Sequence, residues 1–256
     1  MTRYIDFKRN SGLIMLVASL LLLGACSTKP VKVGEPVEVP VFPADRVLDP
    51  GTRYKVDEVS DPFQGVNRTI YRFNYHFDRY VFLPGVAAYQ YITPDPVEKG
   101  LHNFFNNLTD VTTLINSILQ LDLEKTMNST TRVFINSTIG LAGFLNIASD
   151  VPKKEEDFGQ TLGYWGVGNG PYIVLPILGP SNLRDGVGLG VDWWVRNELI
   201  RRNTDLESYQ EMAINLLWAL DRRAHINFRY LETGSPFEYE MVRMLYTTKR
   251  KLDIER

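Results

Sequence analysis

Chemistry typical of helix starts recurs along this chain and constrains its fold more than any other feature. An Asp or Ser, a proline and a later Glu or Gln stand in order at 61–64, 95–98 and 235–238, and 204–207 repeats the arrangement without proline. In such boxes one side chain caps the first turn, proline fits the first helical position and the third residue closes the box. The sequence therefore predicts a mainly α fold.

Apolar side chains at helical spacing indicate the same fold. A first stripe comprises Phe63, Val66, Ile70, Phe73, Phe77 and Val81. A second long helix is expected over 206–231, ended by Gly234, with shorter amphipathic helices over 97–108, 111–119 and 125–135. The simplest interpretation of these stripes is the core of a soluble protein, and helices lying flat in a membrane are the alternative.

The middle of the chain differs, because glycine and proline recur every few residues from 158 to 190. Glycines at this density are expected to break any long helix, and the apolar run 172–178 is expected to be extended. A long apolar loop is unusual on a surface in water, so we expect this segment to plug a core or to face lipid.

The N-terminus has the pattern of a bacterial lipoprotein signal. A basic start and the apolar stretch 13–23 lead into Leu-Gly-Ala-Cys at 23–26, which resembles a lipobox. Cleavage before Cys26 would leave a diacylglyceryl thioether on its sulfur and an acyl chain such as palmitate on its amine, and several chains hold a protein permanently. We therefore expect a signal peptide over 1–25, a lipidated proline-rich tether over 26–60 and a helical body over 61–256.

A search for reactive groups finds little. A pI near 6.0 does not favour nucleic-acid binding, and a single cysteine with three dispersed histidines contains no local metal motif. Ser181 lacks the second glycine of a hydrolase elbow, since Leu183 stands there, so a turn or helix start is expected. The acidic run 155–157 is expected to be a solvated turn, and Arg184 to lie in the first turn of a following helix. Neither a catalytic residue nor a cofactor is expected.

Several motifs together resemble the MlaA (VacJ) family of lipoproteins. The densest are 156–163 (EDFGQTLG) and 170–176 (GPYIVLP), and the others lie at 63–68, 73–74, 78–80, 100–104, 132–140, 178–181 and 184–185. Residues of these structural motifs are Asn67, Arg68, Phe73, Asn74, Asp78, Arg184 and Asp185. The chain departs from the family pattern at Val111, usually proline, at Leu121, usually glycine, and at Asn146, usually aspartate.

The resemblance implies an outer-membrane lipoprotein that removes mislocalised phospholipid from the outer leaflet and so maintains lipid asymmetry. It implies a ring of short helices lying in the membrane around an amphipathic channel. The implied partners are a trimeric porin and a periplasmic lipid carrier that serves an MCE-type ABC transporter. Candidates for the lipid path or for membrane-facing positions are Phe158, Tyr164, Trp165, Tyr172, Ile173 and Leu175.

Two other functions remain open at this point. The chain could be a lipid-anchored helical scaffold without transport activity, or a lipid hydrolase that uses Ser181 with His225 or His102. The sequence leaves open the direction of transport, the preferred headgroup, the porin, the polar residues of the channel and the oligomeric state.

Overall fold

The structure is a computed structural model that describes residues 59–255, apart from the side chain of Asn203. The expected signal peptide, the expected lipidation site Cys26 and most of the expected tether lie outside the described residues. Helices dominate the described part, which confirms the prediction of a mainly α fold. The elements are α2 (Gln64–Phe77), the π-helical η2 (Asp78–Phe82), α3 (Leu83–Ile92), α4 (Asp95–Leu119), α5 (Leu123–Thr138), α6 (Phe158–Tyr164), β1 (Tyr172–Leu175), β2 (Gly179–Asn182), α7 (Leu183–Asn203), α8 (Ser208–Ala224) and α9 (Glu238–Glu255).

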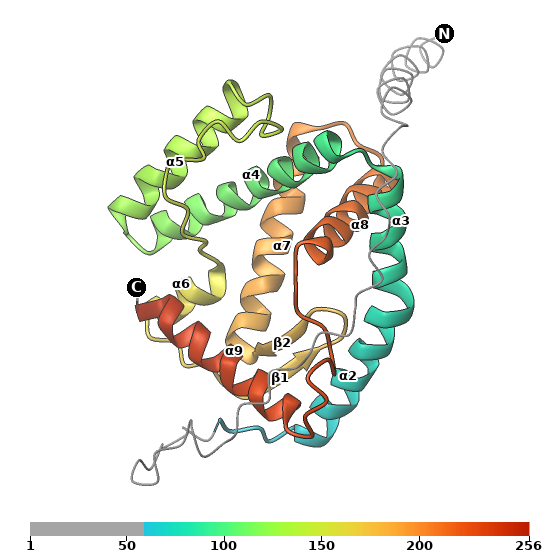
Figure 1. Ribbon diagram of the computed structural model, residues 1–256. Coiled ribbons are helices and arrows are strands. Elements are labelled where there is room, and N and C mark those ends of the chain that lie inside the picture. The colour runs from blue at the N-terminus through green and yellow to red at the C-terminus, as the bar shows by residue number, and fades with distance from the viewer. Residues whose placement is uncertain (1–58, 256) are drawn as a thin grey trace.

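The elements form a closed circuit of contacts. The continuous rod α2–η2–α3 meets α8 at one end, α8 contacts α4, and α4 contacts α6. α6 packs on α9, α9 packs on β2, and β1 returns the circuit to α2. Figure 1 shows this frame with α7 running through its middle, where α7 contacts α4, α6 and both strands. The ring of helices implied by the family resemblance is therefore the observed architecture.

Two predicted helix boundaries were wrong. The segments 97–108 and 111–119 form one helix, α4, because neither glycine nor proline interrupts the chain between them and Val111 continues the helical hydrogen bonding. The helix predicted to reach 231 ends at Ala224. Beyond it, the Arg223 guanidinium donates hydrogen bonds to the carbonyls of Ile226 and Phe228, which holds the chain in a turn.

The helix-start boxes mark helices but not always their caps. The Asp61 carboxylate does not cap α2; it accepts hydrogen bonds from Asn67 and Tyr239 and so links α2 to α9. At the start of α8 the capping box forms between Glu207 and Gln210, three residues later than predicted. At Asp61, contacts with other elements have replaced the local capping pattern.

The glycines of 158–190 do not all break helices, contrary to the prediction. Gly186, Gly188 and Gly190 lie inside α7. A Cβ atom on Gly188 would stand 2.3 Å from the backbone nitrogen of Gly159 in α6. The glycine therefore allows two helices to approach backbone to backbone, which a larger residue would prevent.

The apolar run beginning at 172 is extended, as predicted, over its first four residues. β1 and β2 pair antiparallel, with Tyr172 opposite Asn182 and Leu175 opposite Gly179. Ser181 lies in strand β2 rather than at a turn or helix start, because α7 begins only at Leu183, where the Asn182 side chain accepts a hydrogen bond from the Asp185 backbone nitrogen.

Candidate functional site

The polarity of the molecule is inverted relative to a soluble protein, and α5 shows this most clearly. Its buried positions are Lys125, Ser129, Arg132 and Asn136, which follow one helical face. The opposite face carries Leu123, Met127 and Phe134, which are 65–76% exposed. A helix in water would turn these faces the other way.

The same inversion holds in α2. Asn67 and Asn74 are buried, whereas Phe63, Val66 and Phe73 of the predicted stripe are exposed. The interpretation of this stripe as a soluble core is therefore wrong. Helical spacing identifies two unlike faces, but it does not tell which one points inward.

Exposed apolar side chains also lie along α7, α8 and α9. They include Trp193, Trp194, Met212, Leu216, Leu245 and Leu252. Apolar surface on so many elements is typical of a protein that contacts lipid or another protein. Within residues 59–255, no helix combines the length and the apolar character needed to cross a bilayer.

Two asparagines of α2 attach the hairpin to the rod. Asn67 donates to the carbonyl of Tyr172 at 3.1 Å and accepts from the backbone nitrogen of Val174 at 2.9 Å. Two helical turns later, Asn74 donates to the carbonyl of Leu175 and accepts from the backbone nitrogen of Ile177. Each amide supplies both a donor and an acceptor, so these side chains satisfy the free edge of β1 as a third strand would.

A buried ionic junction joins α6, α7 and α9. Arg250 of α9 contacts both oxygens of Asp157, at 2.6 and 2.8 Å, and reaches Asp185 at 2.8 Å. Asp185 also accepts hydrogen bonds from Arg184 and from the Tyr246 hydroxyl. Arg184 and Asp185 lie in the first turn of α7, as predicted, and their role is to connect this junction.

Neighbouring charges are buried beside the junction. Glu156 is 6% exposed and pairs with Lys125 at 2.8 Å, while Gln120 donates to it at 2.9 Å. The expectation of a solvated turn over 155–157 is therefore wrong at Glu156, because α5 brings a lysine to meet it, whereas Glu155 is exposed. Further along, Arg132 pairs with Asp110 at 3.0 Å in the same polar interior.

The remaining motif residues also make contacts between elements. Asp78 accepts two hydrogen bonds from Arg223 of α8, which ties the π-helical segment to α8. Arg68 pairs with Glu240 of α9 and lies over the ring of Tyr239. Phe73 differs, since its side chain is half exposed on the outer face of α2.

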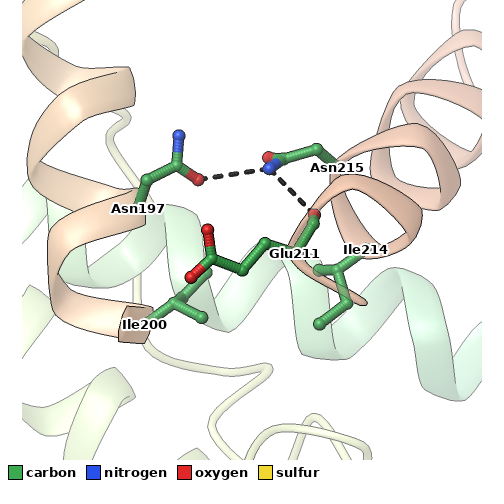
Figure 2. A pocket seen from close by; sticks show the side chains of 5 residues that line it. All are labelled: Asn197, Ile200, Glu211, Ile214 and Asn215. Carbon is green, nitrogen blue, oxygen red and sulfur yellow. Dashed lines mark hydrogen bonds between the residues drawn. The ribbon is translucent and has the colours of Figure 1, made fainter. Parts of the chain in front are cut away.

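A small hollow lies between α7 and α8. Asn215 donates to Asn197 across it, and Glu211 and two isoleucines complete the lining that Figure 2 shows. An adjoining hollow of about 310 Å³ extends to Arg201 and is bordered by Trp193, Met212, Asn197, Ser208, Glu211 and Asn215.

Arg196, one position before Asn197 on α7, is a charged group near Asp192 that forms no ion pair with a described carboxylate. Its guanidinium lies 3.6 Å from the ring centre of Trp218 on α8. Burial and the nearby charge of Arg222 lower the pKa of Arg196 to about 10, so it remains protonated at neutral pH. Among the described residues, no carboxylate stands within ion-pair distance of Arg196 or Arg222.

Glu155 lies near Arg222 at the surface. Its side chain is 64% exposed, and yet desolvation by the surrounding protein raises its pKa. The charges of Lys153, Arg222 and Lys249 outweigh that effect and hold the pKa below its usual value. Because these cations belong to the loop before α6, to α8 and to α9, Glu155 is an exposed group surrounded by charges from different elements.

The six lipid-path candidates occupy different environments. Tyr164 and Trp165 are exposed by more than half, and Phe158 is half-buried. Ile173 and Leu175 are half-buried along β1. Tyr172 is only 2% exposed and packs against Tyr239 and Tyr246, so it belongs to the aromatic core of the protein rather than to a lipid-facing surface.

The groups considered for hydrolysis do not come together. Ser181 is buried in β2, where its hydroxyl donates to the carbonyl of Asn182, and no histidine in the described part of the chain contacts it. His102 and His225 instead stack on each other beside Asp221. Their separation in sequence hid this proximity, which only the contact of α4 with α8 creates.

The sequence matches a known protein family and several named proteins. A family model described as MlaA lipoprotein matches residues 59–253. The intermembrane phospholipid transport system lipoprotein MlaA of Escherichia coli K12 is 41% identical over 135 residues, which cover 50% of this chain and 54% of that protein. The MlaA of Haemophilus influenzae is 36% identical over 143 residues, covering 54% and 57% of the two chains.

Two further similarities complete the comparison. A protein of Rickettsia prowazekii is 40% identical over 130 residues, covering 50% of this chain and 52% of that one. The chain thus spans about half the length of the curated relatives it matches. A solved structure that concerns the maintenance of bacterial outer membrane lipid asymmetry has a TM-score of 0.61 and 29% identity, and the match covers 76% of this chain and 99% of the other.

Proposed function

The chain belongs to the MlaA lipoprotein family, and from that premise we propose that it removes phospholipid from the outer leaflet of the outer membrane and passes it toward the periplasm. The relatives named as parts of an intermembrane phospholipid transport system support this assignment. The observation in this chain that carries the proposal is its inverted polarity, with charged groups inside and apolar groups outside.

The inverted polarity supports a position within one leaflet. Apolar side chains on the outer faces of α2, α5 and α7 can contact acyl chains, while the polar interior shields charged groups from hydrocarbon. Exposing these apolar groups to water would be unfavourable by about 25 cal/mol per Å². A helical ring lying in the membrane removes that cost and needs no spanning helix.

The proposed path for the headgroup follows α7 and α8. The hollow bordered by Asn197 and Arg201 lies between these two helices, and Arg196 and Arg222 of the same helices would supply cations for the phosphate that all glycerophospholipids share. Tyr164 and Trp165 are proposed to contact lipid near this path, because both are exposed aromatic residues. The acyl chains stay in the membrane throughout.

The anchor, the partners and the class of protein are proposed from the family resemblance. Residues 1–25 form the signal peptide, residues 26–60 form a tether anchored by lipids on Cys26, and the body begins near residue 61, close to the start of the family match at residue 59. We propose a trimeric porin and a periplasmic lipid carrier of an MCE-type ABC system as partners. Transport needs no reactive group in this chain, in keeping with a transport component rather than an enzyme.

The test is complementation of a deletion strain. The strain is expected to expose phospholipid at the cell surface, and the wild-type chain should restore the normal level. A variant with both Arg196→Gln and Arg222→Gln should leave most of the surface phospholipid in place, because two phosphate-binding cations are lost. The measurement is labelling of surface phospholipid at matched expression.

Arg202→Gln is the control, since Arg202 is an exposed arginine of α7 that pairs with Glu198 outside the path. The control should complement like the wild type. Normal surface lipid in the deletion strain would contradict the transport proposal itself, and full complementation by the double variant would contradict the path. Release of fatty acid from vesicles that Ser181→Ala abolishes would instead favour a hydrolase.

A further inference from the structure

Three side chains that could bind a metal ion meet where α4 crosses α8. His102 comes from α4, Asp221 from the last turn of α8, and His225 from the C-cap of α8. The imidazole rings stack with centroids 3.6 Å apart, and His102 Nδ1 lies 3.0 Å from Asp221 Oδ2. One candidate ligand atom from each residue lies within 4.8 Å of the other two.

The spacing on α8 suits a shared ligand. Asp221 and His225 stand four residues apart, so both side chains lie on one face of the helix, one above the other. The crossing of α4 supplies the third group from a separate element. Two positions on one helix and one on another can surround an ion on three sides.

Asp221 has an unused acceptor. Its side chain is 2% exposed, and Oδ1 accepts no hydrogen bond of normal geometry from the described residues, although the Tyr89 hydroxyl lies near this carboxylate. The closest basic atom to Oδ1 is His225 Nδ1 at 3.7 Å, too far for a hydrogen bond. A buried carboxylate oxygen without a partner is unfavourable, and a cation at this position would satisfy it.

An ion pair between His102 and Asp221 explains less of this geometry than a bound metal ion does. Protonated His102 would pair with Oδ2, but Oδ1 would not receive that proton. His225 Nδ1 already lies 2.9 Å from the backbone carbonyl of Asp221, which leaves Nε2 as the nitrogen of His225 that can bind an ion. Two protonated imidazoles stacked at 3.6 Å would repel each other. Two neutral imidazoles and one carboxylate, by contrast, form a ligand set that zinc and similar ions prefer.

We propose that His102, Asp221 and His225 bind a divalent transition-metal ion of the zinc type, which links α4 to α8. Metal–ligand distances near 2.0–2.2 Å require the three side chains to close slightly around the ion. His225 can make this movement because it is exposed at the end of its helix. The ion would strengthen one link in the circuit of contacts that closes the ring, and this role does not depend on the transport proposal.

The test uses the purified chain in detergent and titrates it with Zn²⁺ alone by calorimetry. We expect one saturable site per chain, and a rise in Tm of about 5 °C when zinc is about a hundredfold above its Kd. His225→Gln and His102→Gln should each weaken binding by at least about tenfold, because each removes one ligand.

The third histidine provides a matched control. His76 lies on α2 and stacks on Tyr80, so His76→Gln should bind zinc as the wild type does. His225 is the more informative ligand variant, since an exposed C-cap residue tolerates substitution without loss of the fold. Absence of a one-to-one site in the wild type, or equal affinity of the wild type and His225→Gln, would overturn the proposal. Loss of binding in His76→Gln would do the same.

Discussion

At the scale of single residues, the buried charges are stabilised by several partners each. Burial raises the pKa of Asp185, but Arg250, Tyr246 and Arg184 outweigh burial and hold that pKa below its usual value. Arg250 in turn depends on Asp157 and Asp185. Since a buried pair costs desolvation free energy, its contribution appears mainly when one partner is removed and the other stays buried.

Arg250→Met should therefore lower the free energy of unfolding by about 3 kcal/mol, because Asp157 and Asp185 lose their shared cation. The measurement is chemical unfolding in mild detergent. Lys249→Met is the control, since Lys249 is 75% exposed and its ion pair is with Asp253 on the same helix, and it should change stability by less than about 0.5 kcal/mol. Equal stability of the Arg250 variant and the wild type would contradict this role.

The same junction predicts a pH dependence. A carboxyl whose pKa is lowered in the folded state contributes stability above its unfolded pKa of about 4 and loses it as pH falls through the lower folded value. The free energy of unfolding of the wild type should thus decrease below about pH 4. Arg250→Met should show a weaker decrease, because the strongest cause of the lowered pKa of Asp185 is gone.

At the scale of elements, local sequence predicted that helices form but not how long they are or what they contact. Val111 stands where the family pattern usually has proline, and α4 accordingly continues through it. Leu121, where the pattern usually has glycine, adopts φ = 59° just beyond α4. This left-handed conformation is unfavourable for leucine. It is held by backbone hydrogen bonds from Leu121 to Ile118 and from Asp122 to Ser117, which close the end of α4 in the way that glycine usually does.

Two glycines of α7 test the packing of α6 on α7. Gly188→Ala should lower the free energy of unfolding by about 2–3 kcal/mol, because the new Cβ would overlap the backbone of Gly159. Gly190→Ala is the matched control in the same helix, since nothing lies within 4 Å of its Cβ position. It should be neutral or stabilise by up to about 1 kcal/mol through helix propensity. Similar stabilities for the two variants would contradict the close contact.

At the scale of the whole molecule, the polar interior and apolar exterior are typical of a protein whose ring contacts lipid or another protein over much of its surface. The long helices agree on this, because their buried faces carry Asn, Asp, Lys and Arg while Leu, Phe and Trp point outward. The aromatic core around Tyr71, Tyr172 and Tyr239 is small and lies where the hairpin meets α2 and α9. Membrane affinity should therefore depend on exposed residues that contribute little to folding.

Phe134→Glu in the unlipidated Cys26→Ser chain should weaken binding to phospholipid vesicles by about tenfold or more, because it replaces apolar contact with a charge. Its thermal unfolding in detergent should match that of the parent, since Phe134 is 66% exposed. Phe134→Leu keeps an apolar group at the same position and should bind normally. A parent chain without affinity for vesicles would contradict the proposed position in the leaflet.

The sequence by itself determined that the chain is helical, where most helices lie, that residues 172–175 are extended and to which family the chain belongs. These features depend on neighbours within a few residues or on motifs read in order. The tertiary structure decided which face of each helix points inward, how Asn67 and Asn74 hold the hairpin, and that His102 meets His225. A periodic pattern is the same whether water or lipid surrounds the helix, and contacts between distant segments exist only after the chain has closed into its ring.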